Sequence, residues 1–145
     1  MKSCAVKLVI DASVSLKWAL GAGDGEQDVA KAESILAAIV RQQHLAIQPP
    51  HWFAEVLAVI ALKRPQKLEE AFNVLQAVPH EDCGSVMLYK RAARLSVQLK
   101  HHLFDTLYHA VALENDATLV TADDAYFAKA YRLGNIKPLT SFAGS

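Results

Sequence analysis

Acidic side chains interrupt the most apolar stretches of this sequence, and they are its most informative feature. Asp11 directly follows VKLVI, Glu55 lies within HWFAEVLAVIAL, Asp105 lies within HLFDTLYHAVAL, and Asp123 follows ATLVTA. An ionised carboxylate in apolar surroundings is unfavourable unless another group compensates its charge. Four such residues, spread along the whole chain, indicate one acidic pocket that holds a cation.

Carboxylates that converge repel one another and do not all stay ionised without a counter-charge. Mg²⁺ prefers oxygen ligands and takes one or two carboxylates directly, and Mn²⁺ suits similar ligands. No spacing of histidines and cysteines in this sequence indicates zinc. A divalent cation in such a pocket either activates a bound water or stabilises charge on a phosphate during in-line displacement. The sequence leaves open whether one ion or two would bind.

Helix capping is the alternative explanation for several of these acids. Ser13 is the expected N-cap of a short helix over residues 13–20, and Asp11 could share that role. Asp105 alone would be explained as an N-cap. Asp123 could begin a turn or cap the next helix, but Asp124 is the expected cap there and remains a possible extra acid of the site.

The elements that must position these residues alternate between short apolar strands and helices. Strands are expected at residues 6–10, 45–47, 117–121 and 136–139, with a short extended segment from Val78. Helices are expected at 13–20, 29–40, 51–63, 65–75, 85–99, 104–114 and 124–133, and the one at 51–63 is apolar nearly all round, which predicts a buried helix. This alternation indicates an α/β protein with a parallel sheet and helices on both faces.

Strand ends explain how the acids could meet. In open parallel sheets, ligands bind beyond the carboxyl ends of the strands. Asp11 and Asp123 each follow a predicted strand and therefore belong at the same edge. Asp105 and Glu55 lie near helix starts, which also face that edge. Glu55 has the weakest structural explanation, because glutamate is a poor N-cap and its neighbours are apolar.

Length and charge indicate one ordinary globular domain over residues 1–145. The chain has 52% apolar residues, and its 15 basic residues balance its 15 acidic ones. Net charge therefore gives no general attraction to nucleic acid or membranes. Cys4 and Cys83 form no spaced motif, so a reducing cytoplasm is the default expectation.

The N-terminal segment does not read as a signal peptide. Lys7, Asp11 and Lys17 break any apolar region of the required length. No uninterrupted apolar stretch is long enough to span a bilayer. We therefore expect a soluble protein with no membrane partner.

The segments IDASVSLKW (10–18), PPHWFAEVLAVI (49–60) and LFDTLYHAVALENDATLVTAD (103–123) together resemble PIN-domain ribonucleases, in particular the VapC-type toxins of toxin–antitoxin pairs. The resemblance runs from residue 6 to about residue 138, in the expected order. It implies a three-layer α/β/α sandwich with a central parallel sheet of about five strands. It also implies cleavage of RNA phosphodiester bonds that depends on Mg²⁺ or Mn²⁺.

The same resemblance implies roles for individual residues and for partners. Asp11, Glu55, Asp105 and Asp123 would form the catalytic and metal-binding quartet, and Ser13 and Thr121 would be polar residues that orient these acids or bound water. Proteins of this type form homodimers and are silenced by a cognate antitoxin, whose arginine reaches the acidic pocket. Guanidinium groups pair well with carboxylates, which makes that inhibition chemically reasonable.

One departure concerns the acid that often follows the LKW segment in this family. In this sequence only Asp24 and Glu26 lie nearby, within a glycine-rich loop.

An RNA substrate requires cations near the acids, since phosphate contacts provide affinity without sequence information. Trp52 is expected in the core, His101 and His102 in a polar loop, and Tyr108 and His109 in structural roles. The candidates for phosphate contacts, with Trp18 as a candidate for base stacking, are Lys17, Lys63, Arg64, Lys67, Lys90, Arg91, Arg94 and Lys100.

Other functions remain possible from the residues alone. Asp11, Ser13 and Ser15 match a D-x-S-x-S pattern that resembles the adhesion sites of von Willebrand A-type domains, which would make the protein a non-catalytic metal-dependent binding module. Asp11 could instead be the nucleophile of a small-molecule phosphohydrolase, although the usual second aspartate is replaced by Ser13. A catalytically idle dimerisation partner is a further alternative, against which the intact acids argue.

Overall fold

The computed structural model describes residues 5–21 and 26–142, so Cys4 and Asp24 lie outside the described residues. Its strands are β1 (Val6–Ile10), β2 (His44–Gln48), β3 (Glu81–Asp82), β4 (Thr118–Thr121) and β5 (Ile136–Pro138). Its α-helices are α1 (Ala12–Leu20), α2 (Val29–Val40), α3 (Trp52–Lys63), α4 (Leu68–Ala77), α5 (Val86–Leu99), α6 (Leu103–Glu114) and α7 (Asp124–Ala130). Short 3₁₀ turns at Pro65–Lys67, Tyr131–Leu133 and Leu139–Ser141 join or follow them.

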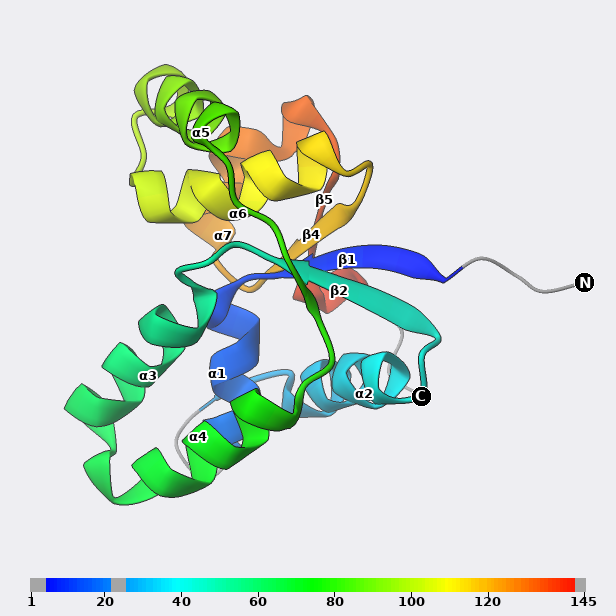
Figure 1. Ribbon diagram of the computed structural model, residues 1–145, viewed down its shortest axis with the longest axis vertical. Helices are drawn as coiled ribbons and strands as arrows, with labels where there is room; N and C mark the ends of the chain where they lie inside the picture. Colours follow the sequence, from blue (N-terminus) through cyan, green and yellow to red (C-terminus); the bar gives the residue numbers. More distant parts are fainter. Residues whose placement is uncertain (1–4, 22–25, 143–145) are drawn as a thin grey trace, which may run out of the picture.

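The strands form one parallel sheet in the order β3-β2-β1-β4-β5. Helices α1 to α4 lie on one side of the sheet and α5 to α7 on the other (Figure 1). This arrangement confirms the predicted three-layer α/β/α sandwich. The edge position predicted for the last strand is also confirmed, and β5 tolerates Pro138 there because an edge strand needs only half of its backbone hydrogen bonds.

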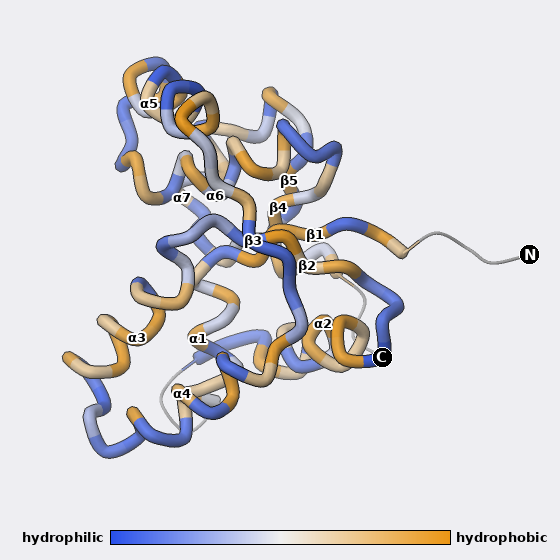
Figure 2. Tube along the Cα trace, in the orientation of Figure 1, coloured by the Kyte–Doolittle hydropathy of each residue, from blue (hydrophilic) through white to orange (hydrophobic). Residues whose placement is uncertain are grey.

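Branched apolar side chains place β1 and β4 at the centre of the core. Val9 and Val120 are fully buried, and the two strands pair in the register Val9 with Leu119 and Ile10 with Val120. Hydrophobic segments accordingly meet along the middle strands (Figure 2). Helix α6 lies directly on this sheet, because its residues 106–112 are all buried. The sheet and α6 therefore form a rigid base for the residues at their ends.

Helix α3 differs from the prediction that it would be buried all round. Only Trp52, Val56 and Ile60 are buried along it, whereas Leu62 is 84% exposed. These buried residues recur every four positions, so they form one stripe that faces the core. The sequence pattern was misleading because the opposite face is also apolar.

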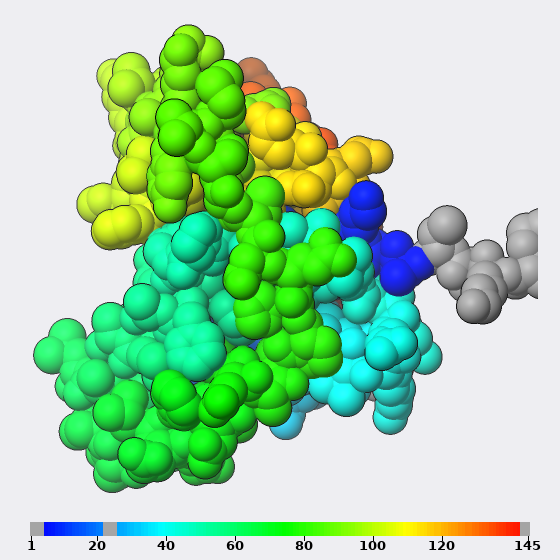
Figure 3. Space-filling model, in the orientation of Figure 1, coloured from blue at the N-terminus to red at the C-terminus, as the bar shows by residue number. Residues whose placement is uncertain are grey.

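The segment between α4 and α5 crosses the face shown in Figure 3 and connects the two helical layers. Among the described residues, no helix is both long enough and apolar enough to cross a membrane.

Candidate functional site

The site lies where the neighbouring strands β1 and β4 end. At this point the order in which the chain adds strands to the sheet changes direction. The chain moves from β1 to β2 on one side and later returns to β4 on the other, which is the usual ligand-binding position in doubly wound sheets. The backbone N–H of Asp11 donates to the carbonyl of Val120 at 3.0 Å, so the two strand ends remain aligned.

Gln48 fixes the end of β1 from its other side, a role that the sequence analysis missed. Its side chain is 1% exposed, accepts from the N–H of Ile10 at 2.8 Å and donates to the carbonyl of Ile10 at 2.9 Å. The amide thus replaces the backbone pairing where β2 moves away from β1. Because Ile10 immediately precedes Asp11, these two hydrogen bonds fix the backbone position from which the Asp11 side chain extends.

Asp11 is the N-cap of α1, which corrects the prediction that Ser13 would be the cap. Its Oδ2 accepts from the backbone N–H of Ser13 at 3.1 Å and from the Ser13 hydroxyl at 2.5 Å. The Ser13 hydroxyl also accepts from the N–H of Ala122 at 2.9 Å, which connects α1 to the end of β4. Ser13 therefore joins Asp11 to the end of β4 through its hydroxyl.

Asp123 is the N-cap of α7, so the prediction that Asp124 would be the cap is wrong. The Asp123 carboxylate accepts from the N–H of Tyr126 at 3.0 Å, whereas Asp124 is the exposed first residue of the helix. Thr121 accepts from the Asp123 N–H at 3.0 Å and donates to Asp11 Oδ2 at 3.5 Å. The Thr121 hydroxyl thus links these two acids.

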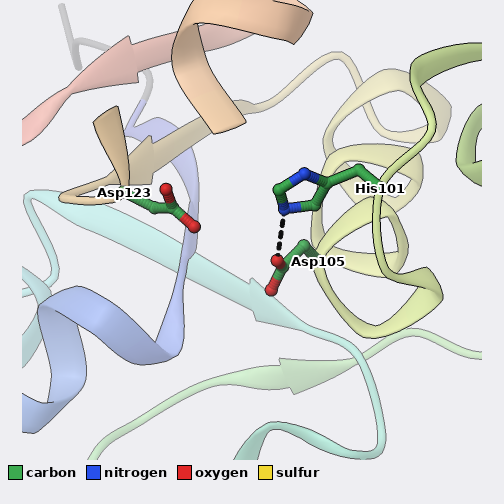
Figure 4. Close-up of side chains that lie close together, drawn as sticks. All are labelled: His101, Asp105 and Asp123. Atoms are coloured by element: carbon green, nitrogen blue, oxygen red, sulfur yellow. Dashed lines mark hydrogen bonds and ion pairs between the residues drawn. The ribbon is translucent and has the colours of Figure 1, made fainter. Parts of the chain in front are cut away.

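Asp105 is the third residue of α6, and the N-cap explanation for it is wrong. The N-cap is His102, and the Asp105 carboxylate instead contacts the imidazole of His101, with Oδ2 and Nε2 2.7 Å apart. Asp105 and Asp123 approach from opposite sides (Figure 4). One ligand atom from each of His101, Asp105 and Asp123 lies within 4.8 Å of the other two. From the sequence, a polar loop is favoured for His101 over a role as a ligand; the loop is confirmed, and its imidazole lies beside these acids.

Glu55 lies in the first turn of α3 and reaches α6. It accepts from the Tyr108 hydroxyl at 2.7 Å, and His51 Nε2 lies 3.9 Å from the same oxygen, Oε1. His51 Nε2 donates to the Phe104 carbonyl at 2.9 Å, because a carbonyl oxygen only accepts. Burial lowers the pKa of His51 below its usual value. His51 and Tyr108 therefore hold the starts of α3 and α6 together beside Glu55.

The acids influence one another electrostatically. Burial raises the pKa of Asp11 to about 7, hydrogen bonds from Ser13 oppose this rise, and the charges of Asp105 and Glu55 add to it. Burial also raises the pKa of Tyr126, to which the charges of Asp105, Asp11 and Asp123 contribute. The four acids thus share one region of negative potential, although Asp11 and Glu55 are not part of the group formed by His101, Asp105 and Asp123.

This donor set suits a divalent cation. Asp105 and Asp123 offer the carboxylate oxygens that magnesium and manganese accept, and His101 Nε2 contacts Asp105 at 2.7 Å. Asp11 is only 7% exposed, and an ionised carboxylate at such a position needs a positive partner. A cation close to Asp11, Asp105 and Asp123 would supply it.

Two of the alternative functions lose support from the surroundings of α1. The Ser15 hydroxyl is fully buried and accepts from the indole N–H of Trp52 at 2.9 Å, so it packs in the core rather than completing a D-x-S-x-S metal site. The same bond confirms the core position predicted for Trp52. Asp11 is buried and bonded to Ser13, which is unsuitable for a nucleophile that must reach a phosphate ester.

Several predicted RNA contacts have partners within the protein. Lys17 is 7% exposed and forms an ion pair of 2.9 Å with Glu26, which rules it out as a surface contact. Arg91 pairs with Glu114 at 2.8 Å. His109 is fully buried, with Nδ1 2.9 Å from the Tyr126 hydroxyl and Nε2 2.8 Å from the Gly134 carbonyl, which confirms its structural role.

Fold and site together define a doubly wound α/β protein with an acidic centre at the switch point of its sheet. The family model of the PIN domain matches residues 8–133, and the chain belongs to the PIN domain family. No curated protein matches it in sequence.

Several solved structures share the fold. VapBC2 from Rickettsia felis, bound to a DNA fragment from its promoter, has 14% identity and a TM-score of 0.66, covering 92% of this chain and 98% of the other. A toxin–antitoxin complex from Klebsiella pneumoniae has 14% identity and a TM-score of 0.64, covering 91% and 97%. The sarcin-ricin loop cleaving toxin VapC20 of Mycobacterium tuberculosis has 12% identity and a TM-score of 0.61, covering 95% and 98%.

Proposed function

We propose that this protein is a metal-dependent endoribonuclease of the VapC type, the toxin of a toxin–antitoxin pair. The observation that carries the proposal is the approach of Asp105 and Asp123, with the buried Asp11 beside them, at the switch point of a PIN-domain sheet. The similar structures include two toxin–antitoxin complexes and one toxin that cleaves the sarcin-ricin loop.

The residues divide the work according to their surroundings. Asp105 and Asp123, with Asp11 close to them, would hold the cation, and Glu55, which accepts from Tyr108, would orient a water. Ser13 and Thr121 would not contact the cation themselves. Their hydrogen bonds with Asp11 and Asp123 would restrict how these acids rotate. When bound, Mg²⁺ or Mn²⁺ would supply an activated water and neutralise charge on the phosphate.

The remaining parts of the proposal concern the setting of the protein. We propose a single domain over residues 1–145 that acts as a cytoplasmic homodimer, with a cognate antitoxin whose arginine occupies the acidic pocket. The half-buried free thiol of Cys83 agrees with a reducing compartment. Bidentate pairing of guanidinium with Asp105 or Asp123 would compete directly with the cation.

The test incubates purified protein with total RNA and a labelled single strand, first in Mn²⁺ or Mg²⁺ and then in EDTA. We expect cleavage that needs the cation and is lost in Asp105→Asn and in an Asp11→Asn/Asp105→Asn double variant, both still folded by circular dichroism. Glu114→Gln is the matched control, because Glu114 is an exposed acid paired with Arg91. RNA cleavage by the folded double variant at the wild-type rate would refute the proposal.

A further inference from the structure

His101 lies in the short turn between α5 and α6, and its position is fixed from several sides. Its side chain is only 12% exposed, and its ring contacts that of Tyr126 edge-on, with the centroids 4.9 Å apart. The backbone carbonyl of His101 accepts from the hydroxyl of Ser96 on α5. The imidazole therefore has little freedom to turn away from Asp105, toward which Figure 4 shows it pointing.

Two contacts identify the nitrogen of this imidazole that carries the proton: Asp105 at Nε2 and Lys129 at Nδ1. The Lys129 Nζ lies 3.3 Å from Nδ1 of His101 and donates to the carbonyl of Lys100 at 2.9 Å. An ammonium group has donors only, so Nδ1 must be the acceptor in this contact. In the neutral ring the proton then lies on Nε2, which faces Asp105 Oδ2 at 2.7 Å.

We propose that His101 is a positioning residue that acts through Asp105, in the tautomer that the contacts with Asp105 and Lys129 both require. The inference rests on the proposed function, because Asp105 is there a metal ligand. The Nε2–H group donates to one lone pair of Oδ2 and fixes the rotation of the carboxylate, so that its remaining lone pairs face Asp123. Partners of this kind, which orient a ligand without binding the metal, are typically worth 10- to 100-fold in metal affinity.

The first experiment measures the tautomer directly. Long-range ¹H–¹⁵N spectra of the imidazole groups, recorded at pH 8 without metal, should show His101 protonated on Nε2 alone. Lys129→Met is the control and should keep the proton on Nε2, because the Asp105 carboxylate at that nitrogen only accepts. A wild-type ring protonated on Nδ1, or a mixture of both tautomers, would overturn the proposed hydrogen bond to Asp105.

The second experiment measures Mn²⁺ affinity by calorimetry and needs no cleavage. We expect His101→Leu to raise the Kd about tenfold, and His101→Gln to restore most of the affinity, because its terminal amide donates from nearly the same place. His102→Leu is the matched control and should leave the Kd unchanged, since the His102 ring lies 5.8 Å from that of His101 and is not part of the group formed by His101, Asp105 and Asp123.

The outcomes separate this inference from the proposed function. Unchanged Mn²⁺ affinity in folded His101→Leu would overturn the positioning role and leave the nuclease proposal standing. Nitrogen hyperfine coupling to bound Mn²⁺ that disappears in His101→Gln would show that the ring is itself a ligand, which also overturns it. A wild-type protein that binds no Mn²⁺ would overturn both.

Discussion

Asp11→Asn is the substitution whose effect can be worked out most fully. In the metal-free protein, burial raises the pKa of Asp11 from 3.8 to about 7. Between these two values the folded state keeps a proton that the unfolded chain has released. Stability therefore falls as the pH rises through this range, and the loss is complete above the pKa of the folded state. The two pKa values correspond to a loss of about 4 kcal/mol.

Asparagine should remove this loss with little structural cost. The Ser13 N–H, the Ser13 hydroxyl and the Thr121 hydroxyl all donate to the same oxygen of Asp11, Oδ2, and the amide oxygen of asparagine can take its place. Asparagine is also as good an N-cap as aspartate. In EDTA at pH 8.5 we expect Asp11→Asn to be more stable than wild type by roughly 2–4 kcal/mol, which raises Tm by roughly 5–10 °C.

The assay is urea and thermal unfolding of both proteins in EDTA at pH 5 and pH 8.5. At pH 5 the folded carboxyl is still neutral and only the unfolded chain has released its proton, so the stability difference should shrink to about 1.5 kcal/mol. Asp124→Asn is the matched control and should follow wild type at both pH values, because Asp124 is exposed. Adding Mn²⁺ at pH 8.5 should stabilise wild type more than Asp11→Asn. A stability difference independent of pH, or an Asp11→Asn protein less stable at pH 8.5, would refute the reasoning.

Three smaller changes test other parts of the site. Gln48→Leu leaves the buried N–H and carbonyl of Ile10 without partners and should cost about 2–4 kcal/mol in urea unfolding, an expectation that a wild-type midpoint would contradict. Ser13→Ala removes a hydrogen bond that lowers the pKa of Asp11, so carboxyl ¹³C titration without metal should show that pKa above 7 rather than unchanged. Lys100 and His101 both line a hollow of about 650 Å³. Lys100→Met should weaken RNA binding in EDTA and reduce the slope of log affinity against log salt concentration by about 0.7. An unchanged slope would exclude a phosphate contact at Lys100.

Local sequence patterns were sufficient for most of the fold and for the edge at which the acids lie. Asp11 and Asp123 could be placed together because each directly follows a buried strand, and parallel strands end at one edge. The exact cap of α7 could not be predicted, since both Asp123 and Asp124 are good N-caps. The choice depends on where β4 ends, and Thr121 fixes this by accepting from the N–H of Asp123.

Other features depend on tertiary packing that no local pattern contains. Helix α3 carries apolar residues on two faces, so its sequence does not show which face packs against the core. Only the folded structure shows that Val56 is buried and Leu62 exposed. Gln48 at the end of a strand gives no sign that it will bond to Ile10. His101 did carry a signal, because a histidine four residues before Asp105 lies on the same side of a helix start.

The histidines beside the acids explain why the pocket can still accept a cation. Within the residues that the structure describes, the ion-pair partners of Glu55 and Asp105 are His51 and His101, each four positions earlier in the chain. His101 Nε2 forms a hydrogen bond with Asp105, whereas His51 Nε2 donates to the Phe104 carbonyl and lies 3.9 Å from Glu55. A lysine or arginine at either position would neutralise that charge and occupy the space of the metal. Burial lowers the pKa of His51, which disfavours a fixed positive charge next to Glu55 and leaves that carboxylate available to a cation.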